Sequence, residues 1–212
     1  MKEIKIKKIL LKTDPVDVNE VSTILNELEK HKLEFAPWKT FSYKPDVAFS
    51  IFYTPSHILL KYFVREKEIR AVVNETNGPV WEDSCVEFFI SFDSAKGYYN
   101  FEFNCVGTCL VGYGSSKDDR HLLSPEFLKS LKIATNVNYN DPENINWELT
   151  VCIPLNLFIF SSLPELTGAT YRANFYKCGD QLSSPHFVAW SEIISATPNF
   201  HLPEFFGKLD FE

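Results

Sequence analysis

The chain has 212 residues, which fits one large all-β domain or, alternatively, two small ones. Hydrophobic residues make up 45% of the chain and aromatic residues 15%, a composition that supports a sizeable core and favours β-strands. The formal net charge of −7, without a basic face in the sequence, argues against a nucleic-acid partner, and no apolar stretch is long enough to span a bilayer.

The first 44 residues predict one strand and one helix. Ile4-Lys5-Ile6-Lys7 alternates apolar and basic side chains, as is typical of an edge strand whose lysines discourage pairing with other sheets. Residues 17–30 place apolar side chains at helical spacing, and Asp17 with Glu20 resembles a capping pair. We therefore expect residues 1–44 to form a strand and helix extension, with the helix packed across an end or an edge of the sheets.

Residues 45–212 predict many strands separated by turns. Residues 47–53 and 58–64 predict one hairpin, and residues 84–92 and 98–111 predict another around the loop at 93–97. A short helix is predicted from Ser124-Pro125, with Phe127, Leu128 and Leu131 on its apolar side, and further strands at 133–139, 147–153, 171–177, 187–191 and 205–211. Strands at such short intervals indicate an all-β fold, an antiparallel β-sandwich or a barrel, with short peripheral helices.

Several of these strands alternate between an apolar and a polar face. In residues 84–92, for example, Val86, Phe88 and Ile90 share one face, and Glu87 lies on the other. Acidic, amide, guanidinium and phenol groups recur on the polar faces: Glu87, Asn100, Glu102, Asn104, Glu148, Arg172, Asn174 and Tyr176. If these faces belong to one sheet, they form a patch of fixed hydrogen-bonding groups. The alternative is the ordinary solvated face of an antiparallel sheet.

Such a patch matches the chemistry of a sugar. Carboxylates and amides make strong hydrogen bonds with hydroxyls, and a tryptophan offers a large apolar surface to the C–H face of a sugar ring. Trp81 directly precedes the strand that carries Glu87. The alternative for Trp81 is a place in the core.

The five cysteines, Cys85, Cys105, Cys109, Cys152 and Cys178, are an odd number. The Lys-rich start of the chain holds only a short apolar run, Ile9 to Leu11, and so does not read as a secretory signal. Both features predict reduced thiols and a cytoplasmic location. Because there is no Cys-x-x-Cys, we expect no metal site, and the strand cysteines read as small hydrophobic residues.

Five segments resemble parts of carbohydrate-binding module family 9. Residues 81–89, Trp-Glu-Asp-Ser-Cys-Val-Glu-Phe-Phe, resemble the family's Trp-x-Asp-x-x-Val-Glu-x-Phe signature, and residues 98–108 resemble its next strand, which ends in an Asn-x-x-Gly turn. Residues 172–177, Arg-Ala-Asn-Phe-Tyr-Lys, resemble a late strand, and residues 189–191 and 200–207 resemble the closing segments. The match covers residues 45–212 in family order and is nearest to stand-alone members of Bacteroidetes type.

The resemblance implies a jelly-roll or DOMON-like β-sandwich that binds glucose- or xylose-type mono- or oligosaccharides without catalysis. Trp81 matches a stacking tryptophan and Glu87 a hydrogen-bonding carboxylate. Trp190, the only late tryptophan, is the candidate for a second stacking residue, and Arg172 is the candidate for a family arginine that has no direct counterpart. The expected ligand-binding set is Trp81, Asp83, Glu87, Asn104, Arg172, Asn174 and Trp190.

Other functions stay open alongside this one. An intracellular interaction module would keep the fold and change or lose the sugar. A glycoside hydrolase would need two carboxylates that flank a cleft, for which Glu87 with Glu102, or Asp83 with Glu87, are the candidates. Haem ligation of the kind seen in DOMON-like relatives needs Met and His, and Met1 is the only methionine. Structural calcium would use loop carboxylates, Asp93, Asp118 and Asp119, although their spacing is not that of an EF-hand.

We thus expect no catalytic residues, no cofactor, a carbohydrate ligand, and neither nucleic acid nor membrane as a partner; a structural calcium stays open as the alternative. The oligomeric state stays open.

Overall fold

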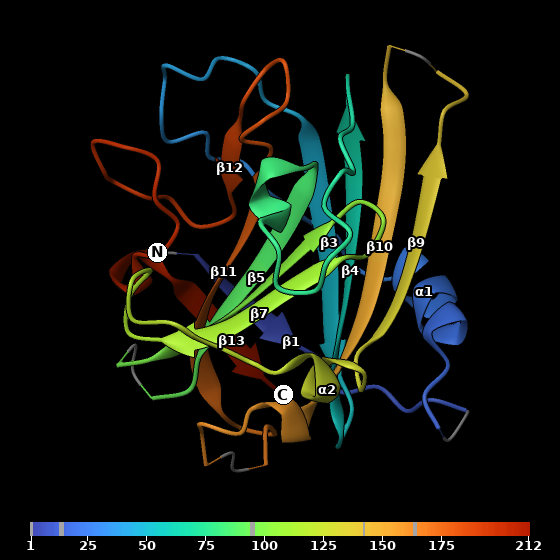
Figure 1. The fold of residues 1–212 in the computed structure, drawn as a ribbon. Coiled ribbons are helices and arrows are strands. Elements are labelled where there is room, and N and C mark those ends of the chain that lie inside the picture. Colours follow the sequence, from blue (N-terminus) through green and yellow to red (C-terminus); the bar gives the residue numbers. More distant parts are fainter. Residues whose placement is uncertain (1, 13–14, 94–95, 142, 163–164) are drawn as a thin grey trace.

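Two β-sheets packed face to face form the protein (Figure 1). The computed structural model describes residues 2–12, 15–93, 96–141, 143–162 and 165–212. The all-β sandwich expected from the strand spacing is confirmed, and the barrel alternative is not. Within the described residues, no helix has the length and apolar character needed to cross a bilayer.

The larger sheet has the strand order β1-β13-β11-β5-β6-β7-β8, and β12 pairs with β11 beside that path. Its members are β1 (Glu3–Ile6), β5 (Cys85–Ser91), β6 (Tyr98–Asn104), β7 (Cys109–Gly114), β8 (His121–Leu122), β11 (Thr170–Cys178), β12 (Phe187–Ala189) and β13 (Gly207–Phe211). All pairs are antiparallel except β1 with β13. The lysine-bearing β1 lies at an edge, as its sequence predicts.

The smaller sheet has the order β2-β3-β4-β10-β9. Its members are β2 (His31–Lys32), β3 (Asp46–Tyr53), β4 (His57–Glu66), β9 (Lys132–Asn138) and β10 (Ile145–Pro154). The hairpin predicted for 47–53 and 58–64 corresponds to β3 and β4. Residues 1–44 contribute β1 to one sheet and β2 to the other.

The helices are short. They are α1 (Val18–Asn26), α2 (Pro125–Leu128) and the 3-10 turns η1 (Val80–Glu82), η2 (Leu155–Leu157) and η3 (Pro203–Phe205). The Asp17 side chain caps α1 by accepting from the amide of Asn19, and Glu20 accepts from the amide of Lys12. On α2, Leu128 is buried but Phe127 is half exposed, contrary to the prediction.

The position of α1 corrects the sequence prediction, because the helix lies on the outer face of the smaller sheet and not at an end or edge. Its buried Val21 and Leu25 pack against Phe52, Leu59 and Cys152 of β3, β4 and β10. These three sheet residues point away from the sandwich interior and are apolar, so they need a cover. The burial of apolar surface on this face therefore sets the place of the helix.

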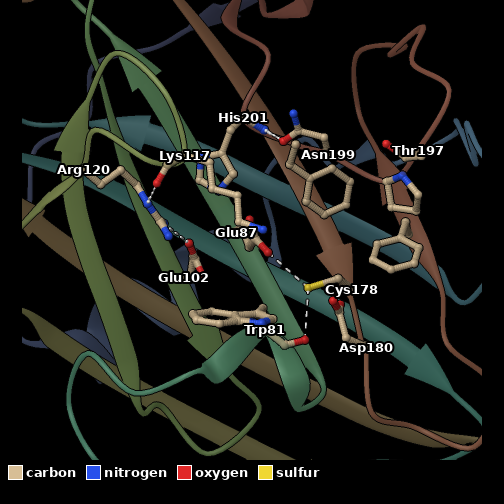
Figure 2. Close-up of a pocket in the computed structure, with 13 residues that line it drawn as sticks. Trp81, Glu87, Glu102, Lys117, Arg120, Cys178, Asp180, Thr197, Asn199 and His201 are labelled. Atoms are coloured by element: carbon tan, nitrogen blue, oxygen red, sulfur yellow. Dashed lines mark hydrogen bonds and ion pairs between the residues drawn. The ribbon is translucent and has the colours of Figure 1, made fainter.

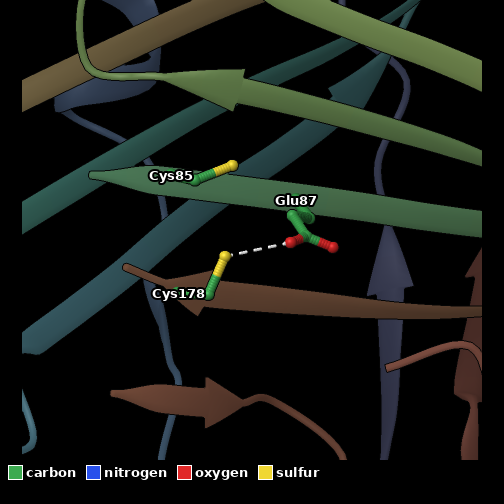
Figure 3. A group of neighbouring side chains, drawn as sticks. All are labelled: Cys85, Glu87 and Cys178. Carbon is green, nitrogen blue, oxygen red and sulfur yellow. Dashed lines mark hydrogen bonds between the residues drawn. The ribbon is translucent and has the colours of Figure 1, made fainter. Parts of the chain in front are cut away.

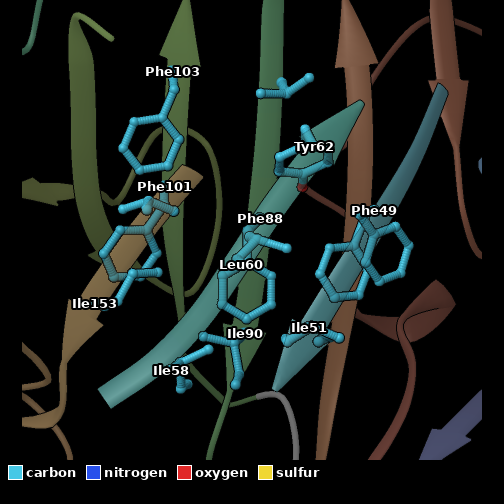
Figure 4. Packing of buried hydrophobic residues seen from close by; sticks show 14 of the residues in the cluster. Phe49, Ile51, Ile58, Leu60, Tyr62, Phe88, Ile90, Phe101, Phe103 and Ile153 are labelled. Carbon is cyan, nitrogen blue, oxygen red and sulfur yellow. The ribbon is translucent and has the colours of Figure 1, made fainter. Parts of the chain in front are cut away.

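The core fills the space between the two sheets (Figure 4). Phe175 of β11 is stacked against Phe49 of the opposite sheet, with ring centroids 3.7 Å apart, and against Phe88 of β5 at 5.0 Å. The inward residues predicted from alternation on β5, β6, β10 and β11 all belong to this cluster. Their partners in the larger sheet therefore face outward, where a second cluster and a pocket lie.

A buried ion pair joins the sheets at one end. The ammonium of Lys177 on β11 lies 2.9 Å from a carboxylate oxygen of Glu66 on β4, and both side chains are fully buried. Trp147 donates its indole N–H to the other Glu66 oxygen at 2.6 Å. Burial and the neighbouring Lys177 lower the pKa of His186 to about 3, so its neutral ring accepts a hydrogen bond from the lysine at 2.8 Å.

Candidate functional site

A pocket of about 320 Å³ lies on the outer face of the larger sheet (Figure 2). Its floor is formed by β5, β6 and the end of β11, which contribute Glu87, Glu102 and Cys178. Residues outside these strands complete it: Trp81 of η1, Lys117 and Arg120 of the loop after β7, Asp180 after β11, Phe187 of β12, and residues 197–201. The outward polar face predicted from alternation is therefore covered by loops and is not an open solvated surface.

Trp81 is half buried and lines this pocket. The chain reaches η1 through Asn77, whose φ of 65° is left-handed, followed by Gly78 and Pro79. The carbonyl of Trp81 accepts a hydrogen bond from the amide of Asp180 at 3.2 Å, which ties η1 to the segment after β11. The indole is therefore held at the pocket wall with part of its surface free.

Asp83 and Asn104 hold η1 in place from outside the pocket. The fully buried Asp83 carboxylate accepts from the amides of Val72 and Val73, from the guanidinium of Arg70 and from the Asn104 amide. The side-chain oxygen of Asn104, Oδ1, in turn accepts hydrogen bonds from the amides of Val106 and Thr108 in the following turn. Buried polar groups with all their bonds inside the protein have little left to offer a ligand. Both residues thus help to position Trp81, which lies two residues before Asp83.

Two carboxyl groups lie side by side on the pocket floor. Glu87 and Glu102 are direct cross-strand partners, and they are 3% and 2% exposed. Arg120 donates to Glu102 at 3.0 Å, and Asn100 donates to the same oxygen at 2.9 Å. Glu87 has a weaker donor, the thiol of Cys178 at 3.1 Å. The pair shares one wall, whereas a glycosidase places its two carboxyl groups on either side of the scissile bond.

The surroundings of Glu87 and Glu102 shift their pKa values to different extents. Burial and the neighbouring Glu102 carboxylate raise the pKa of Glu87 well above its usual value. Burial also raises the pKa of Glu102, but Arg120 and Asn100 oppose that effect. Glu102, paired with the cation, is therefore the ionised partner, and Glu87 holds a proton to higher pH.

Asp180, two residues after Cys178, adds a third acid to the pocket lining. One of its carboxyl oxygens is buried and has no hydrogen-bond partner among the described residues. Burial raises the pKa of Asp180 to about 6. On another wall, burial and the charge of Arg120 lower the pKa of His201 to about 3, and its ring nitrogen lies 2.9 Å from the hydroxyl of Tyr98. Asp180 and His201 thus add an unpartnered carboxyl oxygen and a neutral imidazole to the pocket lining.

Aromatic rings also line the pocket. Phe200 is stacked on Tyr176 of β11, with centroids 4.2 Å apart and planes 6° from parallel, and Phe187 meets Phe200 edge to face. The pocket therefore combines fixed hydrogen-bonding groups with flat apolar surface, which is the combination that binding of a sugar ring requires.

The remaining predicted site residues lie outside this pocket. Trp190 is 1% exposed and packs edge to face on Phe49 and Phe175 in the core between the sheets. Asn174 is fully buried and bonds the backbone of Ser191. Arg172 donates to the carbonyl of Phe206 at 3.0 Å, next to η3. Of the seven predicted residues, the structure brings together Trp81 and Glu87 at the pocket.

Sequence reasoning missed most of the pocket lining. The sequence places Glu102 on the polar face and offers it as a catalytic acid, but the expected ligand-binding set does not include it. Lys117, Arg120, Asp180, Asn199, Phe200 and His201 come from loops, where neither alternation nor spacing predicts which way a side chain points. The calcium candidates serve local turns in part: Asp93 accepts from the amide of Gly97 and Asp119 from the hydroxyl of Ser115.

Comparison with known proteins places this geometry in a family. The sequence profile described as Carbohydrate-binding family 9 matches residues 18–211. A proposed carbohydrate-binding protein from Bacteroides uniformis, known from its crystal structure, is 41% identical, with a TM-score of 0.92 over 100% of this chain and 99% of that one. A search of curated proteins gives no significant match.

Two more distant structures share the fold. They are a carbohydrate-binding module of family 9 from Caldicellulosiruptor kristjanssonii in complex with cellotriose and one in complex with glucose. The first is 15% identical with a TM-score of 0.64, covering 100% of this chain and 94% of that one. The second is 14% identical with a TM-score of 0.59, covering 100% and 96%. The fold, the profile and the Bacteroides uniformis structure agree: this chain belongs to carbohydrate-binding family 9, a family of non-catalytic modules.

Proposed function

We propose that the pocket binds a glucose- or xylose-type mono- or oligosaccharide, with one sugar ring stacked on Trp81. The observation that supports this most is a half-buried indole beside a pocket that holds three acids, an amide and two cations. The volume of about 320 Å³ is near the low end for small-molecule pockets, about 300–1,000 Å³, and suits a short ligand.

The polar groups have different roles in this proposal. The protonated Glu87 donates to one sugar hydroxyl. Glu102 keeps Arg120 in place and accepts from another hydroxyl, and the unpartnered Asp180 oxygen is a further acceptor. Asn199 and Lys117 complete the rim. The two Caldicellulosiruptor modules in complex with cellotriose and with glucose support the choice of sugar class.

Calorimetry with glucose, xylose, cellobiose and cellotriose tests the proposal, with galactose for comparison. We expect Trp81→Ala to weaken binding by at least about 30-fold, or about 2 kcal/mol, because truncating a central stacking aromatic costs that much. Phe160→Ala is the matched control, since Phe160 is a half-exposed aromatic residue that does not line the pocket.

Absence of binding for all of these sugars would overturn the proposal. Unchanged affinity in Trp81→Ala would overturn the stacking role alone. An interaction module that has lost its sugar would give the first result, so the same experiment decides between the two functions.

A further inference from the structure

Two cysteines and a carboxyl group converge at the floor of the pocket (Figure 3). Cys85 on β5 and Cys178 on β11 are direct cross-strand partners. Glu87 lies two residues after Cys85, so its side chain leaves the same face of β5. One potential ligand atom from each residue, two sulfurs and a carboxyl oxygen, lies within 4.8 Å of the other two.

The spacing of these atoms is near that of a metal site. The Cys178 sulfur lies 3.1 Å from a Glu87 oxygen. In a tetrahedral zinc site, with Zn–S of about 2.3 Å and Zn–O of about 2.0–2.2 Å, a sulfur and an oxygen ligand are about 3.5 Å apart and two sulfurs about 3.8 Å apart. Because the three atoms lie within 4.8 Å of one another, movements of up to about 1 Å would bring them to a common ion.

We propose that Cys85, Glu87 and Cys178 form a binding site for a thiophilic divalent cation of the Zn²⁺ class. Two thiolates favour Zn²⁺ over Ca²⁺ or Mg²⁺, which take oxygen ligands. Three protein ligands leave a fourth position, and it faces the pocket, because Glu87 and Cys178 line the pocket whereas Cys85 lies behind them. The pocket is thus the route by which the ion enters.

Acidic and basic groups around the cluster are equal in number, so the affinity for a cation would come from the three ligands themselves. Without an ion, burial raises the pKa of Cys85 to about 11 and that of Cys178 well above its usual value, so both thiols are protonated at neutral pH. The neighbouring charged groups are Glu102 on β6, Asp180 after β11, Arg120 of the loop after β7 and Lys177 on β11. A bound ion releases the thiol protons to solvent, and its affinity increases as the pH rises.

A sugar and the ion would compete for Glu87. If the pocket binds sugar as proposed above, a bound ion occupies the Glu87 carboxylate and weakens sugar binding, and the sugar weakens ion binding by the same factor. This competition alone depends on the proposed function. The metal site itself does not.

The test titrates the full chain, stripped with a chelator, with Cd²⁺ as a Zn²⁺ analogue, followed by the thiolate-to-cadmium absorption band, and with Zn²⁺ by calorimetry. We expect saturation at one ion per chain. Cys85→Ser should weaken Zn²⁺ binding by at least about tenfold, because even loss of an outer-shell partner costs about 10- to 100-fold. It should also halve the cadmium band, since one of two thiolates is lost.

Cys152→Ser is the matched control, since Cys152 is also a fully buried strand cysteine but packs under α1. It should leave both readouts unchanged. If Cys85→Ser does not fold, Glu87→Gln decides the question: it keeps both thiols, so the cadmium band should persist while Zn²⁺ affinity falls by at least about tenfold.

The inference is overturned if the wild type shows no cadmium band. It is also overturned if the folded Cys85→Ser protein binds Zn²⁺ as tightly as the wild type does, or if Glu87→Gln does so where Cys85→Ser fails to fold. Because Cys85 does not line the pocket, glucose binding by Cys85→Ser should match that of the wild type. Loss of metal binding with intact glucose binding therefore separates the metal site from the proposed function.

Discussion

Replacing Glu87 by glutamine tests whether this buried acid holds a proton at neutral pH. Glu87 is 3% exposed, faces Glu102 across the strand pair, and has a thiol as its donor, whereas the cation Arg120 is bound to Glu102. Burial, and then the Glu102 charge, raise the pKa of Glu87 well above its ordinary value of 4.5. Glutamine mimics the protonated acid and cannot ionise.

The sign and size of the effect follow from proton linkage. Above pH 4.5 the unfolded chain loses the Glu87 proton, while the folded chain keeps it until its raised pKa is reached. The stabilisation is therefore complete below pH 4.5 and is lost as the pH rises through the folded pKa. The free energy of unfolding of the wild type, relative to Glu87→Gln, falls by about 1.4 kcal/mol per pH unit, or up to about 2.7 kcal/mol between pH 5 and pH 7.

Urea denaturation of both proteins at pH 5, 6, 7 and 8 measures this difference. Taking the difference between the two proteins removes the contributions of His186 and His201, which titrate in both, whereas the charges of Glu102 and Asp180 act on Glu87 and belong to the measured effect. Glu126→Gln, which removes an exposed carboxylate on α2, controls for the loss of one carboxyl group. Unfolding free energies of wild type and Glu87→Gln that run parallel from pH 5 to pH 8 would refute the reasoning.

Three further substitutions test other parts of the fold. Lys177→Met should lower the free energy of unfolding, measured in urea, by about 3–5 kcal/mol, because it leaves the buried Glu66 carboxylate without its cation. Adding Glu66→Gln to this variant should recover much of the loss, and no recovery would argue against this cause. Arg172→Ala should lower the free energy of unfolding by about 1–3 kcal/mol in the same assay, because the Arg172 side chain bonds a backbone carbonyl. Since that contact lies outside the pocket, glucose affinity should change less than about twofold, and a larger change would place Arg172 at the ligand. Gly207→Ala should lower the melting temperature measured by calorimetry, because the new Cβ would lie 2.4 Å from the Trp190 ring, and an unchanged melting temperature would show that the ring can move aside.

Sequence patterns predicted the sandwich because strand alternation reflects burial directly. On β5, β6, β10 and most of β11, every second side chain is apolar and enters the core, with Lys177 of the buried ion pair as the exception on β11. This period is set by the backbone alone. The same pattern placed Glu87 on the outer face. It could not show that Asp83 and Asn104 bond each other, because that contact depends on how the segment after η1 lies against the end of β6.

The family motif contained both kinds of residue without distinguishing them. Trp81 and Glu87 reach the pocket, whereas Trp190 fills the core beside Gly207, and Asn174 bonds the backbone of Ser191. A tryptophan late in the sequence looks the same in either role. The position of α1 was also misjudged, because the sequence of a helix shows that it has an apolar face but not which sheet surface that face covers.

By itself, the amino-acid sequence determined the two-faced strands, their order as hairpins, and a tryptophan placed just before an acidic strand, since these depend on residues near one another in the chain. The tertiary structure alone decided which polar groups share a pocket. Glu102, Arg120, Asp180 and His201 are far apart in sequence and meet only because strand pairing and loop packing bring them to the same face of one sheet. The same pairing sets Cys85 opposite Cys178, which no spacing in the sequence could indicate.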